Sequence, residues 1–231
     1  RNFGGEPFSH RDTSFSYAGK TKLGGITMIN CNGFRHAVKG SLDFQIEEVD
    51  GGYAEGPFYS RYAADVYLPY MFALRARTGL DLFADPRIEK MHDWSLNLRL
   101  PNGRRPNIDD GHLDDFYGHY LAAVYPDGGV HRWDWENNER GLYVREFSEM
   151  DAIALYDDSV PAMEPEHGPS VFMPGAGDAV FRSDWSAAAT YMLLRGEHGV
   201  ARAKGFSHEH ADETSFVLYA GGEMLAVDAG L

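Results

Sequence analysis

Two histidines separated by a single residue, His208 and His210, are the side chains in this sequence best suited to chemistry. They lie in the run FSHEHADETSF, which is expected to enter a strand, and alternate residues of a strand point to the same face. Asp228 lies at the end of the next predicted strand, and pairing across a Gly221-Gly222 turn would bring it near His210. Two histidines and one carboxylate can form part of a zinc shell that needs another ligand. The alternative is a pair of surface histidines on a strand edge.

A second candidate for chemistry is the run DGGYAEGPFYSRY, which covers residues 50–62. Tyr59 and Tyr62 are three residues apart and would share one face of a helix that begins there. A phenol at the start of a helix, beside Arg61, could have a lowered pKa and serve as a base. The alternative is a pair of tyrosines that pack in the core.

Two further groups lie between these runs. The first consists of acids and histidines, namely Asp109, Asp110, His112, Asp114, Asp115 and His119. They could bind a divalent ion, or they could be the capping and first-turn acids that a helix dipole favours. The second group is Trp133 and Trp135, which alternate in HRWDWENNERG and could stack on sugar rings or pack at the rim of a helical domain.

Taken together, the two main runs resemble motifs of the heparinase II/III-like family of polysaccharide lyases. DGGYAEGPFYSRY resembles the motif of the family's helical toroid that carries its catalytic tyrosine. FSHEHADETSFVLYAGGEMLAVDAG resembles the opening β-sheet motif, H-x-H-x-D-x-x-S-F followed by D-x-G. Between them, RPNIDDG looks like a family loop ending in a Gly-Asp pair, with Asp109 where glycine is usual, and GDAVFRSDW resembles the first strand of the β-domain. The resemblance extends over nearly the whole chain from residue 45 onward.

The resemblance implies a role for each matching residue. Tyr59 matches the catalytic acid and base, with Tyr62 as the neighbouring candidate, and His208 matches a catalytic or charge-neutralising histidine. His210 and Asp228 match ligands of the zinc that some members carry, which would be structural because the elimination itself requires no cofactor. The residues expected to contact substrate are Glu55, Arg61, Trp133 and Trp135.

β-Elimination of a uronate polysaccharide explains why these residue types would be needed. The C5 proton beside the sugar carboxylate is weakly acidic, so the carboxylate charge must be neutralised by His⁺, Asn or Arg as the enolate develops. A base must reach C5, and an acid must protonate the glycosidic oxygen at C4. One tyrosine can do both when the two positions lie on the same face of the ring.

The elements that must position these residues begin as helices. Residues at helical spacing from position 59 onward predict an apolar stripe made up of Tyr59, Tyr62, Val66, Tyr70 and Leu74. Pro69 is expected to kink that helix. Asp85 and Pro86 predict the start of a second helix, whose apolar stripe would be Ile88, Met91, Trp94 and Leu98. Further helices are expected over residues 113–124 and from Ser148.

Strands are expected after a stretch without periodicity. Pro161–Pro169 contains three prolines, so we place the domain boundary there. Beyond it, Ala189–Leu194 and Ser215–Ala220 read as strands, and the Gly221-Gly222 turn joins the latter to Met224–Val227. Helices followed by strands predict an α+β multidomain fold with segregated domains rather than alternating βαβ units.

The resemblance assigns residues 1–160 to the C-terminal part of an incomplete (α/α) toroid and residues 161–231 to the first strands of an antiparallel β-sandwich. The chain begins without Met and stops after a strand-like run, so it is expected to be an internal, truncated piece. Two family elements are not found. The last zinc ligand would lie beyond Leu231, and the upstream asparagine has no clear match among Asn30, Asn32 and His36.

Composition restricts the class of partner. A net charge of −14 gives no basic footprint for nucleic acid, and it mildly disfavours a highly sulfated glycan. No apolar run reaches transmembrane length, and the single cysteine, Cys31, excludes an internal disulfide. The expected partner is an acidic polysaccharide, and a homodimer is left open. The resemblance implies a periplasmic or secreted bacterial protein, although no signal peptide is present.

Two other function classes compete with a lyase. A metal-binding cupin would place a glutamate four or five residues after the second histidine, whereas Glu213 follows His210 by three. A non-catalytic glycan-binding fragment would retain the same motifs without turnover. The sequence leaves open whether the polymer is alginate, heparan-type, hyaluronan or chondroitin-type, and whether cleavage is endo or exo.

Overall fold

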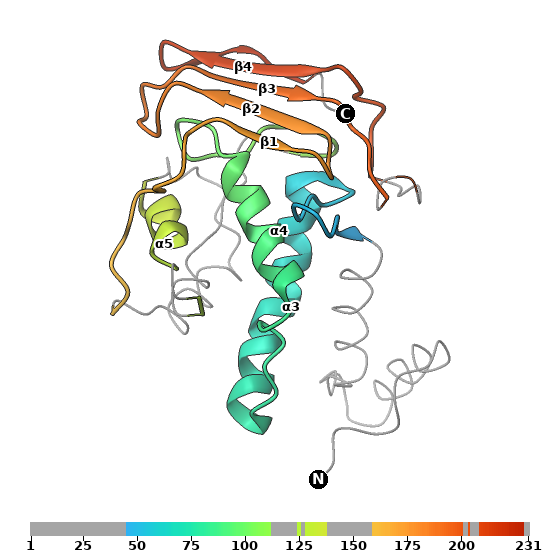
Figure 1. Ribbon diagram of the computed structural model, residues 1–231, viewed down its shortest axis with the longest axis vertical. Coiled ribbons are helices and arrows are strands. Elements are labelled where there is room, and N and C mark those ends of the chain that lie inside the picture. Colours follow the sequence, from blue (N-terminus) through green and yellow to red (C-terminus); the bar gives the residue numbers. More distant parts are fainter. Residues whose placement is uncertain are drawn as a thin grey trace, which may run out of the picture. The chain divides into compact units, whose positions relative to one another are not determined.

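A computed structural model of the chain describes residues 45–111, 124–125, 128–137, 159–200, 203 and 208–228. Ile46–Leu231 form one compact unit, and the described part of that unit contains three helices followed by five strands (Figure 1). The helices are α3 (Gly56–Thr78), α4 (Pro86–Asn97) and α5 (Gly129–Glu136). The strands are β1 (Val171–Met173), β2 (Asp178–Arg182), β3 (Tyr191–Arg195), β4 (Phe216–Ala220) and β5 (Glu223–Ala226). Within these ranges, no helix combines the length and the apolar content that a membrane span needs.

Glycines in the left-handed region define both ends of α3. Gly56 has a φ of 76° and starts the helix, with Pro57 in its first turn. Gly79 has a φ of 75° and ends the helix, where its N–H donates a hydrogen bond to the Arg75 carbonyl. The helix continues through Pro69, so this proline does not end it.

The buried face of α3 differs from the predicted stripe. Ala64, Leu68 and Met71 are almost completely buried, whereas Tyr62 is 50% exposed and Tyr59 is only partly buried. Both sets of residues recur every three or four positions, so spacing alone could not choose between them. The buried set also includes Tyr67, so a hydroxyl group does not keep a side chain out of the core, and the position on the helix is what leaves Tyr59 and Tyr62 outside it.

Helix α4 begins as the sequence predicts. The Asp85 side chain caps it by accepting a hydrogen bond from the Arg87 N–H at 3.0 Å. The predicted apolar stripe is confirmed, because the exposed fractions of Ile88, Met91 and Trp94 do not exceed 1%. Burial of each such side chain contributes about 1.5–3 kcal/mol to stability, which makes α4 the centre of the helical core.

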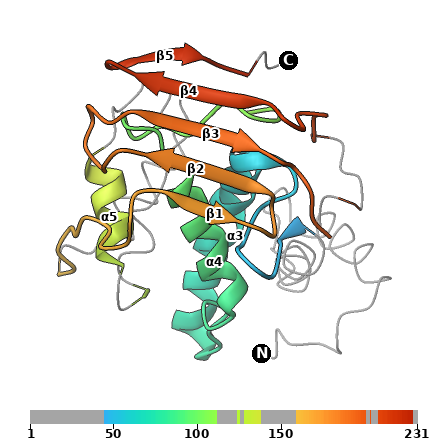
Figure 2. The same cartoon turned by 45° about the horizontal axis from the view of Figure 1, so that its top comes forward.

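The five strands form one antiparallel sheet in chain order, and the helices lie on one side of it (Figures 1 and 2). The predicted turn at Gly221-Gly222 joins β4 to β5, and both glycines have positive φ, as a tight two-residue hairpin requires. The run GDAVFRSDW forms the second strand rather than the first, because the short strand β1 precedes it.

One face of the sheet packs on the helices and the other is exposed. On the inner face, Tyr191 is fully buried and donates a hydrogen bond from its hydroxyl to the Leu98 carbonyl at 3.0 Å, while Trp94 of α4 donates to Asp178 at 3.4 Å. The outer face carries the exposed side chains of Phe172, Phe181, Leu194, Phe216 and Leu225. The alternation of burial along β2 and β3 follows the period of two that a one-sided sheet requires.

Some predictions lie outside the described residues. These include the helices predicted over 113–124 and from Ser148, the possible asparagine matches Asn30, Asn32 and His36, and Cys31. Helix α5 was not predicted from the sequence; it carries the two alternating tryptophans.

Candidate active site

The two histidines do not lie on a strand, contrary to the prediction. Residues 208–215 form turns and loop, and β4 begins only at Phe216. The chain turns because Ser215 donates its N–H to the Asp212 carbonyl and Thr214 adopts a φ of 71°. Strand periodicity therefore does not determine where the His208 and His210 side chains point. We refer to residues 208–212 as the histidine loop.

Tyr59 and His208 are in direct contact. Their ring centroids lie 3.8 Å apart, and the ring planes are inclined by 20°, which is a stacked arrangement. Tyr62 lies next to this pair, with its ring 6.1 Å from that of Tyr59 in an edge contact. The structure thus brings together the tyrosine and the histidine that the sequence predicts to share one sugar.

Gly56 allows the first turn of α3 to approach the neighbouring loop. A Cβ atom at this position would lie 2.6 Å from Oδ2 of Asp109 and 3.0 Å from its Cβ. Together with the positive φ, this contact leaves space only for glycine. The close packing places Tyr59, three residues later, beside the segment that carries Asp109 and Asp110.

Asp109 connects the sheet to the histidine loop. The side chain is completely buried, and its Oδ2 accepts a hydrogen bond from Arg195 Nη1 of β3 at 3.0 Å. Its Oδ1 accepts from the His210 backbone N–H at 3.2 Å, and its own N–H donates to Asp212 at 3.3 Å. Loop, strand and α3 are therefore fixed around one carboxylate.

Arg195 is a buried cation surrounded by acids. Its guanidinium nitrogens lie within 4 Å of four carboxylates, those of Asp109, Asp178, Glu197 and Asp212. Burial opposes the charge on Arg195, but these carboxylates outweigh it and raise the pKa of the guanidinium. Burial also raises the pKa of Asp178 and that of Asp212, although Arg195 lowers both. With one positive charge against four carboxyl groups, this part of the site carries an excess of negative charge.

Asp110 contacts both histidine side chains. Its Oδ2 lies 2.6 Å from Nδ1 of His208, and its Oδ1 lies 2.9 Å from Nε2 of His210. Burial alone would raise the pKa of Asp110, but the hydrogen bonds and charges of the two imidazoles lower it, so the carboxylate is held ionised. From the sequence, Asp110 belonged to a group that could bind a divalent ion or cap a helix, and it was not assigned to His208 and His210.

Glu55 and Arg61 lie in the same segment as Tyr59, and both are about 8% exposed. Burial raises the pKa of the Glu55 carboxyl, while the charge of His208 and a hydrogen bond from its backbone oppose the rise. Glu55 is therefore next to His208. Its predicted role in substrate binding remains a prediction, as does that of Arg61.

Three possible metal ligands, one of them His210, lie close together. One ligand atom from each of His210, Asp212 and Asp228 lies within 4.8 Å of the other two. The end of β5 is held there by Asn107, whose amide donates to the Asp228 carbonyl at 2.9 Å. One imidazole and two carboxylates suit zinc as a donor set. Asp212 was not predicted as a ligand, although it is the aspartate of the H-x-H-x-D pattern.

A second acidic group shares Asp212 and lies next to the first. It consists of Asp109, Glu197 and Asp212, and the Arg195 guanidinium already lies among these carboxylates. We therefore assign the neutralisation of this second group to Arg195.

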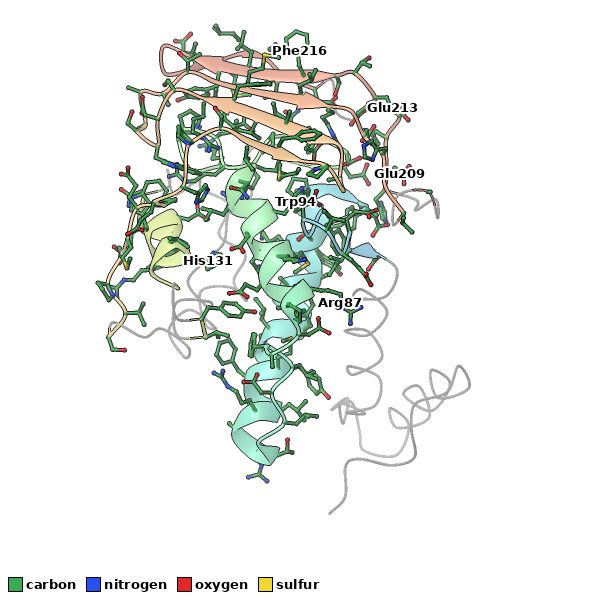
Figure 3. All side chains as sticks on the ribbon, viewed as in Figure 1. Arg87, Trp94, His131, Glu209, Glu213 and Phe216 are labelled. Atoms are coloured by element: carbon green, nitrogen blue, oxygen red, sulfur yellow. The ribbon has the colours of Figure 1, made fainter. Side chains whose placement is uncertain are left out.

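Trp133 and Trp135 lie elsewhere. Figure 3 shows His131 of α5 and Glu209 of the histidine loop on opposite sides of α4. The Trp133 ring packs edge-on against Trp185 at 6.0 Å, with the Arg99 guanidinium 4.6 Å from its centre. The structure therefore does not bring the two tryptophans together with Tyr59. Trp133 instead packs against its neighbours Trp185 and Arg99.

Comparison with known proteins agrees with the predicted resemblance. Residues 165–231 match the family model described as Heparinase II/III-like, C-terminal. A heparinase III with methylated lysines superposes with a TM-score of 0.63 at 17% identity, over 99% of this chain and 33% of that one. A mutant of the heparan sulfate lyase HepC from Pedobacter heparinus gives 0.57 at 22% identity, over 98% and 33%. No curated protein sequence matches the chain.

These comparisons show the fold. The chain spans about a third of the length of the heparinase structures, and its helices and antiparallel sheet follow theirs. A five-stranded sheet in simple chain order after helices is not the jelly roll of a cupin, so that alternative is excluded for the described part of the chain.

Proposed function

We propose that this chain contributes to a polysaccharide lyase that cleaves a uronic-acid-containing glycan by β-elimination. The observation that carries the proposal is the stack of Tyr59 on His208, because an acid/base and a charge-neutralising group must reach the same sugar. The heparinase fold and the match of residues 165–231 support the reaction class.

In the proposed reaction, the Tyr59 phenolate removes the C5 proton while His208 stabilises the negative charge that develops on the sugar carboxylate. The electron pair of the C–H bond forms the C4–C5 double bond, and the bond from C4 to the glycosidic oxygen breaks. Tyr59 then returns the proton to that oxygen. The products are a chain with a 4,5-unsaturated uronate and a chain with a free hydroxyl, so no water or cofactor is consumed.

We also propose a structural zinc held by His210 and Asp228, with Asp212 as a further ligand. The donor set supports this assignment, and a bound cation would reduce the repulsion between the two carboxylates. Through the bound cation, His210, Asp212 and Asp228 would then hold the histidine loop, and with it His208, against Tyr59.

The wider setting follows the same resemblance. We propose that α3 and α4 belong to an (α/α) toroid and that the sheet belongs to a β-sandwich. We propose that the protein acts in the periplasm or after secretion. The net charge of −14 favours a sparsely sulfated uronate polymer over a heavily sulfated one.

The test is turnover by the whole protein on heparan sulfate, alginate, hyaluronan and chondroitin. A lyase generates the ultraviolet absorbance of an unsaturated uronate on at least one polymer. Tyr59→Phe should lower kcat by roughly two to four orders of magnitude, the range for a general acid–base group, with little change in KM. Tyr62→Phe is the matched control, because this neighbouring tyrosine is half exposed.

Two results would contradict the proposal. Absence of the absorbance on every polymer, with glycan binding retained, would make the protein a non-catalytic binding module. Loss of turnover in Tyr62→Phe with normal turnover in Tyr59→Phe would move the acid/base role to Tyr62.

A further inference from the structure

The Asp110 carboxylate meets different ring nitrogens on the two histidines. It faces Nδ1 of His208 at 2.6 Å and Nε2 of His210 at 2.9 Å, using one oxygen for each. Both distances are those of strong, charge-assisted hydrogen bonds. The Asp110 side chain is about 14% exposed, so little water competes for these contacts.

An ionised carboxylate can only accept hydrogen bonds, so each nitrogen that faces it must carry a hydrogen. His208 is thereby held with hydrogen on Nδ1, which leaves Nε2 available to another partner. His210 is held with hydrogen on Nε2, so Nδ1 is the ring nitrogen with which it would bind a cation. One carboxylate thus selects opposite tautomers on two histidines of one short loop.

We propose that Asp110 is a positioning residue that sets the tautomers of both histidines. It makes Nε2 the nitrogen with which His208 would act on the substrate and Nδ1 the nitrogen with which His210 would bind the metal. The part that concerns His208 rests on the proposed lyase function. A carboxylate that fixes the ring of a metal-binding or catalytic histidine commonly changes affinity or activity by about 10–100-fold when it is removed.

The segment that carries Asp110 is itself rigidly held, as a positioning residue requires. Asp109, the preceding residue, is buried and bound to Arg195 and to the His210 backbone. On the other side, Gly111 closes a turn by donating its N–H to the Ile108 carbonyl at 3.0 Å. The backbone of Asp110 is therefore held in place by the residues before and after it, and the two contacts of its carboxylate are not a chance pairing of surface side chains.

The first experiment measures the tautomers directly and needs neither substrate nor turnover. Ring nitrogen chemical shifts of the whole protein, labelled with ¹⁵N-histidine, distinguish hydrogen on Nδ1 from hydrogen on Nε2. His208→Gln and His210→Gln assign the signals. We expect hydrogen on Nδ1 for His208 and on Nε2 for His210. A neutral His208 with hydrogen only on Nε2 would overturn the proposal.

The second experiment replaces one carboxylate oxygen of Asp110 with the NH2 group of an amide. Asp110→Asn keeps the shape but can accept on one side only, so at least one histidine should change its tautomer or lose its hydrogen bond to residue 110, and either change shifts its ring nitrogen signals in the same spectra. We expect kcat on the best polymer to fall about 10–100-fold, with KM changed by less than about threefold. Asp93→Asn is the matched control, because Asp93 also pairs with a histidine, His131, at 3.5 Å on the other side of α4.

A double-mutant cycle separates positioning from general destabilisation. If Asp110 acts through His208, Asp110→Asn should cost less than about twofold in kcat when His208 is already alanine. A full, additive loss in that background, or wild-type kcat in Asp110→Asn, would overturn the proposal. If the wild-type protein has no lyase activity but shows the expected tautomers, the proposed function fails and the role of Asp110 in setting the tautomers stands.

Discussion

Replacing Gly56 with alanine should damage the protein much more than the same replacement at Gly79. Both glycines have nearly the same backbone conformation, with φ of 76° and 75°. Each alanine therefore incurs about 1 kcal/mol for the left-handed conformation. A Cβ at Gly79 meets no atom within 4 Å, whereas a Cβ at Gly56 lies 2.6 Å from Oδ2 of Asp109.

The additional cost at Gly56 depends on whether Asp109 can move. Its carboxylate is held by Arg195 at 3.0 Å and by the His210 N–H at 3.2 Å, so it cannot rotate away without weakening a buried ion pair. Breaking such a pair costs about 3–5 kcal/mol, and a partial displacement should cost about half of that. We expect a total loss of about 3 kcal/mol in Gly56→Ala and about 1 kcal/mol in Gly79→Ala.

Guanidinium unfolding of the two whole-protein variants measures this difference as the change in the free energy of unfolding. Gly56→Ala should also lower kcat, because the shift separates Tyr59 from His208, while Gly79→Ala should leave kcat unchanged. Equal losses of stability in the two variants would refute the reasoning, since they would show that the contact with Asp109 has no energetic consequence.

Two further predictions concern pH and metal. Burial lowers the pKa of His92 from its usual 6.5 to about 3. Between these two pH values the unfolded chain binds a proton and the native histidine does not. The free energy of unfolding should therefore fall as the pH drops from 6.5 towards 3. His92→Leu should flatten this dependence in unfolding curves measured across that range, and an unchanged slope would contradict it. Chelation of divalent cations should lower the melting temperature of the wild-type protein, and excess Zn²⁺ should restore it. At a hundredfold excess of Zn²⁺ over Kd, the free energy of unfolding should rise by up to about 3 kcal/mol. Asp212→Asn should abolish the response, whereas a response of full size in this variant would remove Asp212 from the ligand group.

Local signals in the sequence predicted elements whose ends depend on a few residues. The cap at Asp85, the proline after it and the buried stripe of α4 follow from hydrogen bonding and spacing within twelve residues. The Gly221-Gly222 hairpin follows in the same way from two positive φ angles. The buried face of α3 was predicted wrongly, because two stripes of equal period compete there and only the neighbouring helix and sheet decide between them.

Parts of the candidate site could be found from residue types alone. Tyr59, His208, His210 and Asp228 were singled out because their chemistry and order are distinctive. Asp212 was missed as a ligand, although on the strand predicted there it would have pointed to the same face as His208 and His210. The turn at residues 212–215 instead brings its carboxylate to Arg195 and to the metal group.

The sequence by itself determined which side chains could do chemistry and that helices precede strands, since both depend on residue type and local spacing. Only the tertiary structure decided that Asp110 joins His208 to His210 and that Arg195 lies among four acids. The contacts of Asp110 with the two histidines and that of Arg195 with Asp109 link residues 86 to 100 positions apart, and no local pattern encodes which distant side chain fills a given space. They exist because Gly56 lets α3 pack against Asp109, and the loop, the strand and the helix must then meet at one point.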